Sequence, residues 1–317
     1  MKILVTGGAG FIGSRTVKKL VKQNHDVTVM SRSPLIDDPE VAGKVGVVGG
    51  DMRLFGDVMK AVKTAEPDVI IHLAYALTAA GEADPYWAIQ VNVLGANSFF
   101  EAARLTGVKR VIFCSSIAAY ATQEKYGQRM VTEEEDLLKS GSIYGQTKAL
   151  NEFMAAKFEA KYGVEVPSVR ISAVYGSGRE ARGVTAWTSN MVAAAVAGKP
   201  VRIALRQDQQ ANFIYVEDSA EQLVRLALAD SLQYRIYNSG GTTSTPGEFA
   251  AIVRKYYPQA DISFDDNAPR WPYPHLIDGS RLENEVGFRV RDAEDGLLEQ
   301  INQERINQGM EPLTKKI

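Results

Sequence analysis

Short apolar runs alternate with longer amphipathic segments along the first half of the chain. The runs are rich in valine and isoleucine, and they lie at 3–6, 27–30, 45–48, 68–73, 110–115 and 166–171. Continuous runs of this kind are typical of parallel strands that are buried on both faces. Helices are predicted between them, the longest at 85–105 and 144–162. The alternation predicts an α/β fold built on a Rossmann-type doubly wound parallel sheet.

The alternation loosens after the turn at 175–178. Thr245, Pro246 and Glu248 form a capping-box pattern at the start of a helix. Further elements are predicted as helices at 184–197 and 217–229 and as strands at 212–216, 235–238 and 260–264, of which 235–238 is expected to return to the main sheet. We therefore predict two domains. Residues 1–172 and about 205–238 would form the dinucleotide-binding Rossmann domain, and about 173–204 with 239–317 a smaller C-terminal α/β substrate domain.

The first strand leads directly into a glycine-rich turn and the start of a helix. Gly8, Gly10 and Gly13 match a G-x-G-x-x-G pattern, and Gly7, Gly10 and Gly13 match a related spacing. Such a turn lets the backbone approach a pyrophosphate, which the backbone N–H groups and the positive end of the helix then bind. A glycine-rich turn without a ligand is the alternative. The position between a strand and a helix favours a dinucleotide site.

Composition and charge exclude several classes of protein. The 317 residues are 45% hydrophobic, which is enough for a sizeable core, and the net charge of −2 with no long basic run argues against a nucleic-acid partner. The single cysteine, Cys114, excludes an internal disulfide and fits a reducing compartment. No apolar run approaches the roughly 18 residues of a membrane span. The three histidines lack metal-ligand spacing. We expect a cytoplasmic protein without a metal or a membrane partner.

Three further residues suggest proton-transfer chemistry. Ser116 lies just beyond the 110–115 strand, at the edge where open α/β sheets bind ligands, and Tyr144 and Lys148 share one face of a helix. The lysine ammonium would lower the pKa of the phenol. The tyrosine would move a proton while a hydride passes to or from a nicotinamide. The serine would hold the substrate oxygen. The alternative is a solvated helix face, since Tyr-x-x-x-Lys pairs also arise by chance. The placement after a strand-end serine favours catalysis.

These motifs belong to a longer ordered set. They stand in the order Thr6–Gly13, His72–Ala74, Asn92–Gly95, Ser115–Ser116, Tyr144–Lys148 and Val174–Gly176. In this order the chain resembles the extended short-chain dehydrogenase/reductases, the family of NAD-dependent epimerases and dehydratases, over nearly its whole length. The resemblance implies a catalytic set of Ser116, Tyr144 and Lys148, with Asn92 in support. A helix or loop hydrogen bond is the alternative role for Asn92.

The resemblance also implies a cofactor site and a partner. Its cofactor-binding positions are Gly7, Gly10, Phe11, Ile12, Gly13, Ser31, Arg32, Asp51, Met52, Leu73, Ala74, Tyr144 and Lys148. NAD-preferring relatives carry an acidic residue after the second strand, whereas this chain has Ser31 and Arg32, which suit a 2′-phosphate. We therefore favour NADP, with NAD as the alternative; Arg32 could instead be an ordinary surface charge. Many members dimerise through helices that correspond to 85–105 and 144–162, so a homodimer is expected.

Departures from the family pattern bear on the substrate. The acidic pair of the dehydratases is replaced by Ile117 and Ala118, which makes water elimination unlikely. Ala211 and Ala173 stand where nucleotide-sugar epimerases usually carry Arg and Asn. The candidate substrate-binding residues are Ser116, Arg179, Arg182 and Arg270. We predict an NAD(P)-dependent oxidoreductase acting on a secondary alcohol or ketone, with a slight preference for a small polar compound. A nucleotide-sugar 4-epimerase and a non-catalytic cofactor-sensing regulator are the alternatives.

Overall fold

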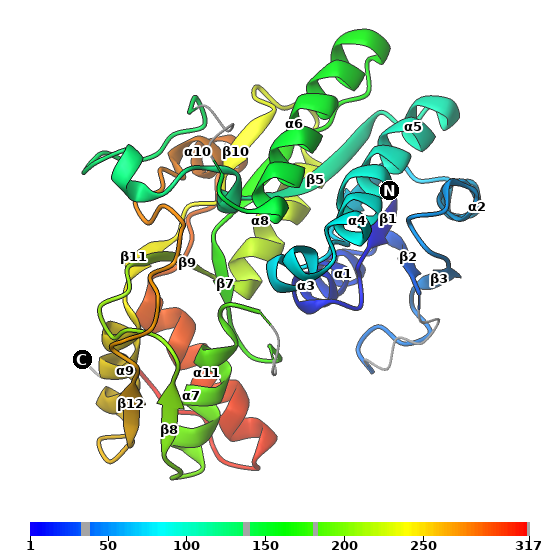
Figure 1. Cartoon of the computed structure of the whole chain (residues 1–317). Helices are drawn as coiled ribbons and strands as arrows, with labels where there is room; N and C mark the ends of the chain where they lie inside the picture. Colours follow the sequence, from blue (N-terminus) through cyan, green and yellow to red (C-terminus); the bar gives the residue numbers. More distant parts are fainter. Residues whose placement is uncertain (33–38, 136–139, 180–182, 316–317) are drawn as a thin grey trace.

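The main sheet of the protein has seven parallel strands. The computed structural model describes residues 1–32, 39–135, 140–179 and 183–315. The sheet has the strand order β10-β6-β5-β4-β1-β2-β3 (Figure 1). Its strands are β1 Lys2–Thr6, β2 Asp26–Ser31, β3 Gly46–Gly49, β4 Val69–His72, β5 Arg110–Ser116, β6 Ser168–Ile171 and β10 Ile236–Asn238. The order reverses between β1 and β4, which places a crevice at their carboxyl ends. The predicted Rossmann-type sheet is confirmed, including the return of 235–238 to pair with β6.

Helices cover both faces of this sheet because the side chains of its strands alternate between two cores. Ile3 and Val5 pack in one core with Leu20 of α1. Leu4, between them, packs in a second core with Phe99 of α5. The helices that cover the sheet are α1 Phe11–Lys22 and α8 Val216–Leu228, which contact each other, and α2 Phe55–Ala65, α5 Ala96–Thr106 and α6 Ile143–Tyr162.

The segment predicted as one helix at 85–105 is divided into three parts. Helix α3 Thr78–Ala83 precedes it, and α4 Pro85–Ala88 then leads into a π-helix, η1 Ile89–Gly95, which continues as α5. Such π-helical stretches are uncommon and often lie at functional sites. Here the stretch contains Asn92, one of the predicted site residues.

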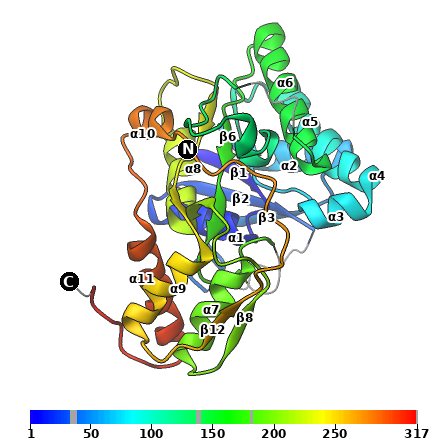
Figure 2. The ribbon, with the colours of Figure 1, turned by 60° about the vertical axis from the view of Figure 1, so that its left-hand side comes forward.

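The remaining elements form two small sheets with their own helices. One sheet has the order β11-β9-β7 and the other pairs β12 with β8. The elements are β7 Ala173–Tyr175, α7 Ala186–Val196, β8 Val201–Ile203, β9 Ala211–Tyr215, β11 Thr242–Ser244, α9 Pro246–Tyr256, β12 Ile262–Phe264, α10 Ser280–Val286 and α11 Ala293–Asn307, with short 3₁₀ turns η2 Ile117–Ala119 and η3 Gln123–Lys125. Helices α7, α9 and α11 lie together below the main sheet in Figure 2. The capping box of Thr245 and Glu248 at the start of α9 is present as predicted.

The segment 205–238 is shared between the two parts of the molecule. Its strand β9 pairs with β7 and β11, whereas its helix α8 packs on α1 and its strand β10 extends the main sheet. In the described part of the chain, no helix combines the length and the apolar character needed to cross a membrane.

Candidate active site

The glycine turn after β1 leaves its backbone exposed to a groove. Gly7 has a φ of +68°, and its carbonyl oxygen accepts a hydrogen bond from the Gly10 N–H at 2.8 Å. A Cβ on Gly13 would lie 2.1 Å from that same oxygen, so only glycine fits there. Helix α1 begins at Phe11, and its cap residue, Gly10, provides no side-chain hydrogen bond to the first turn. The N–H groups of that turn can therefore serve a bound anion.

The groove along this turn has a volume of about 490 Å³. Among the predicted cofactor residues, the following line it: Gly7, Gly10, Phe11, Ile12, Gly13, Ser31, Arg32, Asp51, Met52, Leu73 and Ala74. The bare glycine backbone, the free helix start and the length of the groove fit a dinucleotide. Sequence reasoning missed Arg53, Tyr75 and Trp87, which also line it. Tyr75 directly follows the His72–Ala74 motif, so that motif could have indicated it.

One end of the groove carries two arginines. Arg32 is exposed there, beside Ser31 at the end of β2. Arg53 donates from Nε and Nη2 to Asp51 Oδ2, at 2.9 and 2.6 Å. This hydrogen-bonded contact lowers the pKa of the Asp51 carboxyl below its usual value. Asp51 therefore stays ionised and compensates the charge of Arg53. The charge of Arg32 also lowers the pKa of Asp51, so both arginines lie close enough to interact with this carboxylate.

The structure brings Ser116, Tyr144 and Lys148 together at the end of β5. Ser116 caps the turn η2, where its Oγ accepts the Ala118 N–H at 3.1 Å. Helix α6 packs closely on this turn, because a Cβ on Gly145 would lie 2.0 Å from the Ala118 carbonyl oxygen. This packing brings Tyr144 within hydrogen-bonding reach of Ser116. Lys148 Nζ donates to the Cys114 carbonyl at 2.6 Å and lies 5.5 Å from the centre of the Tyr144 ring.

Burial dominates the protonation of this cluster. Tyr144 and Lys148 are both buried. Burial raises the pKa of the Tyr144 phenol well above its usual value, although its hydrogen bond with Ser116 acts in the opposite direction. Burial also lowers the pKa of Lys148 to about 8. Desolvation of the phenolate is the largest effect on the pKa of Tyr144 in the protein alone, and the expectation that Lys148 lowers this pKa stays a prediction. The raised pKa favours the neutral phenol of Tyr144.

Asn92 holds a loop and lies outside the described linings of both cavities. Its Oδ1 accepts the Ala76 N–H at 2.7 Å, and its Nδ2 donates to the Ala76 carbonyl at 3.2 Å. The Asn92 carbonyl, within the π-helix, accepts a hydrogen bond from Asn151 Nδ2 at 2.6 Å. Asn92 thus joins the segment that carries Tyr75 to η1, and Asn151 joins η1 to α6. Asn92 therefore supports the site by positioning this segment.

A second cavity of about 410 Å³ adjoins the groove and shares Ile12, Tyr75, Leu77 and Arg179 with its lining. It is lined by Ser116 and Tyr144 and by apolar and aromatic side chains that include Val184, Trp271 and Tyr273. No sequence signal pointed to Trp271 or Tyr273, which lie in an irregular loop. The cavity is a candidate place for a substrate, because it is lined by Ser116 and Tyr144 and adjoins the groove.

The predicted substrate-binding arginines have different places in the fold. Arg179 lines both cavities, and its guanidinium carbon lies 5.0 Å from the centre of the Phe11 ring. Burial lowers the pKa of Arg179. Its Nη1 donates to the Val174 carbonyl at 3.4 Å, and its buried Nε has no hydrogen-bond partner in the described part of the chain. Arg270 is exposed and pairs with Asp208 at 2.7 Å, so the structure does not bring it to the site. Arg182 lies outside the described residues.

Taken together, the fold and this site define a dinucleotide-dependent enzyme with a serine–tyrosine–lysine cluster. The model of the NAD dependent epimerase/dehydratase family matches residues 3–240. The chain is 28% identical to the UDP-glucose 4-epimerase of Mycolicibacterium smegmatis over 71% of its length and 72% of that protein.

Solved structures agree with this assignment. An L-threonine dehydrogenase from Cupriavidus necator superposes with a TM-score of 0.84 and 25% identity, covering 96% of this chain and 99% of the other. A Thermus thermophilus UDP-glucose 4-epimerase in complex with NAD gives a TM-score of 0.83 and 26% identity over the same shares. The chain belongs to the NAD dependent epimerase/dehydratase family. It is an enzyme of the extended short-chain dehydrogenase/reductase type.

Proposed function

We propose that this enzyme is an NADP-dependent dehydrogenase or reductase that acts on the secondary alcohol or ketone of a small carboxylic acid. The observation that carries the proposal is the place of Arg179. This partly buried cation donates from Nη1 to the Val174 carbonyl at 3.4 Å, and its Nε has no hydrogen-bond partner among the residues that the structure describes. It lines both the groove and the cavity that holds Tyr144. A buried charge is stable only when it is paired, so a substrate with an anionic group would complete the site.

The cluster supplies the proton chemistry of such a reaction. A nicotinamide dinucleotide, which the residues of the groove would hold, would supply or take up the hydride of such a reaction. In reduction, the Tyr144 hydroxyl donates its proton to the substrate oxygen, and in oxidation the phenolate takes that proton back. Ser116 hydrogen-bonds the same oxygen and holds it beside Tyr144. The ammonium of Lys148 stabilises the phenolate that forms.

The size and lining of the substrate cavity favour a small acid. Among the described residues, its lining includes Val184, Trp271 and Tyr273, which offer apolar and aromatic surface, and Arg179 is the one cation. Ala173, where epimerases of sugar nucleotides usually carry Asn, is also part of the lining. A nucleotide-sugar 4-epimerase is the second candidate, because a relative and a solved structure of similar fold are UDP-glucose 4-epimerases.

A substrate panel tests this assignment. The enzyme is offered 2-hydroxy acids, 3-hydroxy acids, β-hydroxy amino acids such as L-threonine, and UDP-, GDP- and dTDP-sugars, each with NADP⁺ or NAD⁺. Reduction of the nicotinamide is expected with one of the hydroxy acids. Arg179→Gln should raise the KM for that acid about 10- to 100-fold, because a charge-assisted hydrogen bond is lost. Arg179→Lys keeps the charge, so its KM should lie between the KM of the wild type and that of Arg179→Gln. Conversion of a sugar nucleotide to its 4-epimer would refute the choice of substrate.

The choice of cofactor gives a separate prediction. Arg32→Ala is expected to weaken NADP⁺ binding about 10-fold, because the exposed guanidinium at the groove end would contact the 2′-phosphate. NAD⁺ lacks that phosphate, so its affinity should change less than about two-fold. Titration of both dinucleotides into the two proteins measures the effect. Equal NADP⁺ affinity in wild type and Arg32→Ala would contradict the NADP preference.

An exposed apolar surface supports a homodimer. It is formed by Tyr86, Ile89, Leu94 and Leu105 from the 85–106 segment and by Leu150, Phe153 and Tyr162 from α6. The helices lie side by side, joined by a hydrogen bond of 3.0 Å from Asn97 Nδ2 to Asn151 Oδ1. Tyr86 is 74% exposed and Phe153 is 58% exposed. Large exposed apolar side chains on two neighbouring helices favour a partner that covers them.

Disruption of this surface should separate the subunits. Phe153→Glu is expected to shift the protein from dimer to monomer at micromolar concentration, because it places a charge within the apolar contact. Sedimentation velocity measures the shift. Ile306→Glu, at another exposed apolar position on α11, is the matched control and should leave the dimer intact. A wild-type protein that sediments as a monomer would contradict the assignment.

A further inference from the structure

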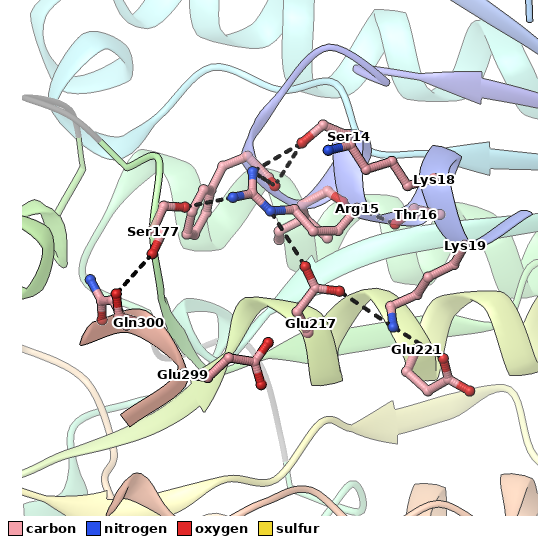
Figure 3. A network of polar contacts seen from close by, with 12 residues as sticks. Ser14, Arg15, Thr16, Lys18, Lys19, Ser177, Glu217, Glu221, Glu299 and Gln300 are labelled. Carbon is pink, nitrogen blue, oxygen red and sulfur yellow. Dashed lines mark hydrogen bonds and ion pairs between the residues drawn. The ribbon is translucent and has the colours of Figure 1, made fainter. Parts of the chain in front are cut away.

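Arg15 joins three segments that are far apart in the sequence (Figure 3). It belongs to the first part of α1, where its Nη1 donates to the Phe11 carbonyl at 3.3 Å and to Ser14 Oγ at 3.1 Å. Its Nη2 donates to the Ser177 carbonyl at 2.6 Å. Its Nε lies 3.7 Å from a carboxylate oxygen of Glu217, at the start of α8. The residue therefore links the glycine turn to the segment that follows β7.

Two side chains donate to backbone carbonyls of the segment 176–179. Arg15 binds the Ser177 carbonyl, and Ser189 Oγ of α7 donates to the Gly176 carbonyl at 2.9 Å. Strand β7 ends at Tyr175, and the next residues turn through Gly176 and Gly178, whose φ values are +141° and +81°. A Cβ on Gly178 would lie 3.2 Å from Arg15 Nη2, so the guanidinium lies closely against this turn. The other described side-chain contact of the segment's Ser177 is weaker, a 3.4 Å hydrogen bond from its Oγ to the Gln300 carbonyl in α11.

Arg179 follows directly on this turn. Its guanidinium carbon lies 5.0 Å from the centre of the Phe11 ring, and that of Arg15 lies 5.2 Å from the same ring. Phe11 is the first residue of α1 and lines the dinucleotide groove. One ring of the cofactor turn thus contacts both the arginine that holds the segment and the arginine that lines the substrate cavity.

We propose that Arg15 is a positioning residue that couples the dinucleotide turn to the substrate cavity. By holding the Ser177 carbonyl against α1, it keeps Arg179 at the junction of groove and cavity. A dinucleotide that orders the first turn of α1 then also orders the segment of Arg179, so each ligand favours the binding of the other. The part played by Arg179 rests on the proposed function, whereas the hold of Arg15 on Ser177 does not.

An ordinary ion pair between Arg15 and Glu217 would be a simpler role, and the geometry argues against it. The Arg15–Glu217 distance is longer than the hydrogen bond to the Ser177 carbonyl, and Glu217 also pairs with Lys19 at 3.3 Å. Partly exposed ion pairs contribute little to stability. The Ser177 contact is therefore the one that distinguishes Arg15 from its neighbours on α1.

Hydrogen exchange of the backbone amides at 176–179 tests the hold directly. In the unliganded dimer or monomer, Arg15→Ala should accelerate this exchange about 10-fold, because a charge-assisted hydrogen bond is lost. Glu217→Gln and Lys19→Ala are matched controls that remove the charge pairing between α1 and α8 and leave Ser177 in place; their exchange should stay within about two-fold of wild type. Wild-type exchange in Arg15→Ala, or equal acceleration in Glu217→Gln, would overturn the proposal.

Kinetics test the consequence for the reaction. With an acid substrate from the panel, Arg15→Ala should raise the KM about 10-fold and change kcat by less than about three-fold. In a protein that already carries Arg179→Gln, Arg15→Ala should raise the KM no further, because Arg15 acts through Arg179. An additional loss in the double variant would overturn this route. If no acid is turned over, the proposed function fails, and the exchange measurement still decides whether Arg15 holds the segment.

Discussion

Replacement of Tyr144 by phenylalanine is expected to lower kcat by about 10²- to 10⁴-fold, the usual contribution of a positioned proton donor. The variant keeps the ring, so the packing of α6 on η2 should survive. The hydroxyl alone is lost, and with it the hydrogen bond to Ser116 and the proton for the substrate oxygen. Steady-state turnover on the panel substrate and NADP⁺ titration measure the two effects. The Kd for NADP⁺ should change by less than about three-fold.

Tyr126→Phe provides the matched control. Tyr126 is also buried, and its hydroxyl accepts the Ala121 N–H at 3.1 Å, but it lies outside the described linings of both cavities. This variant should lose some stability and keep nearly full turnover. Wild-type turnover in Tyr144→Phe would show that another group moves the proton and would remove the basis of the mechanism.

Lys148→Met should lower kcat by about 10²-fold or more and should also change the dependence of the reaction on pH. Burial lowers the pKa of Lys148 to about 8. Below that pH the side chain is an ammonium, and above it the side chain is neutral. In the reduction direction the wild-type kcat/KM should therefore fall as the pH rises through about 8, because the cation that stabilises the forming phenolate is lost.

The pH profile separates this role from simple packing. In Lys148→Met the fall near pH 8 should be absent, because no group remains there to titrate. Lys199→Met, at an exposed lysine after α7, should keep the wild-type profile. If the fall near pH 8 persists in Lys148→Met, the titrating group is a different one, and the assignment of Lys148 must be withdrawn.

Local patterns carried most of what could be predicted about the cofactor side of the site. The turn from Gly7 to Gly13 needs bare backbone at fixed spacing, and that requirement is visible in the sequence itself. Tyr144 and Lys148 likewise lie on one helix, where a separation of four residues places them on one face. The strands of the main sheet were also predictable, because burial on both faces produces unbroken runs of Val and Ile.

The substrate side depends on contacts between distant segments, which local patterns do not reveal. Arg270 and Trp271 are neighbours in the chain, yet Arg270 pairs with Asp208 in solvent while Trp271 lines the cavity. Strand 212–216 was correctly placed in the sequence, but pairing with β7 and β11 decides which sheet it joins. The π-helical stretch that contains Asn92 also has no sequence signal, since its residues suit an ordinary α-helix.

The turn and the rim of the dinucleotide groove differ greatly in how much mutation they tolerate. A methyl group on Gly13 would meet the Gly7 carbonyl oxygen at 2.1 Å, and one on Gly8 would meet the Val29 side chain at 2.8 Å. Ser31, Arg32 and Arg53 lie instead at the groove end, where Arg32 and Arg53 are exposed to solvent and meet no such steric limit. Substitutions can therefore accumulate at the rim while the turn stays fixed. If the rim meets the 2′-phosphate as proposed, the coenzyme preference can evolve separately from the backbone that binds the pyrophosphate.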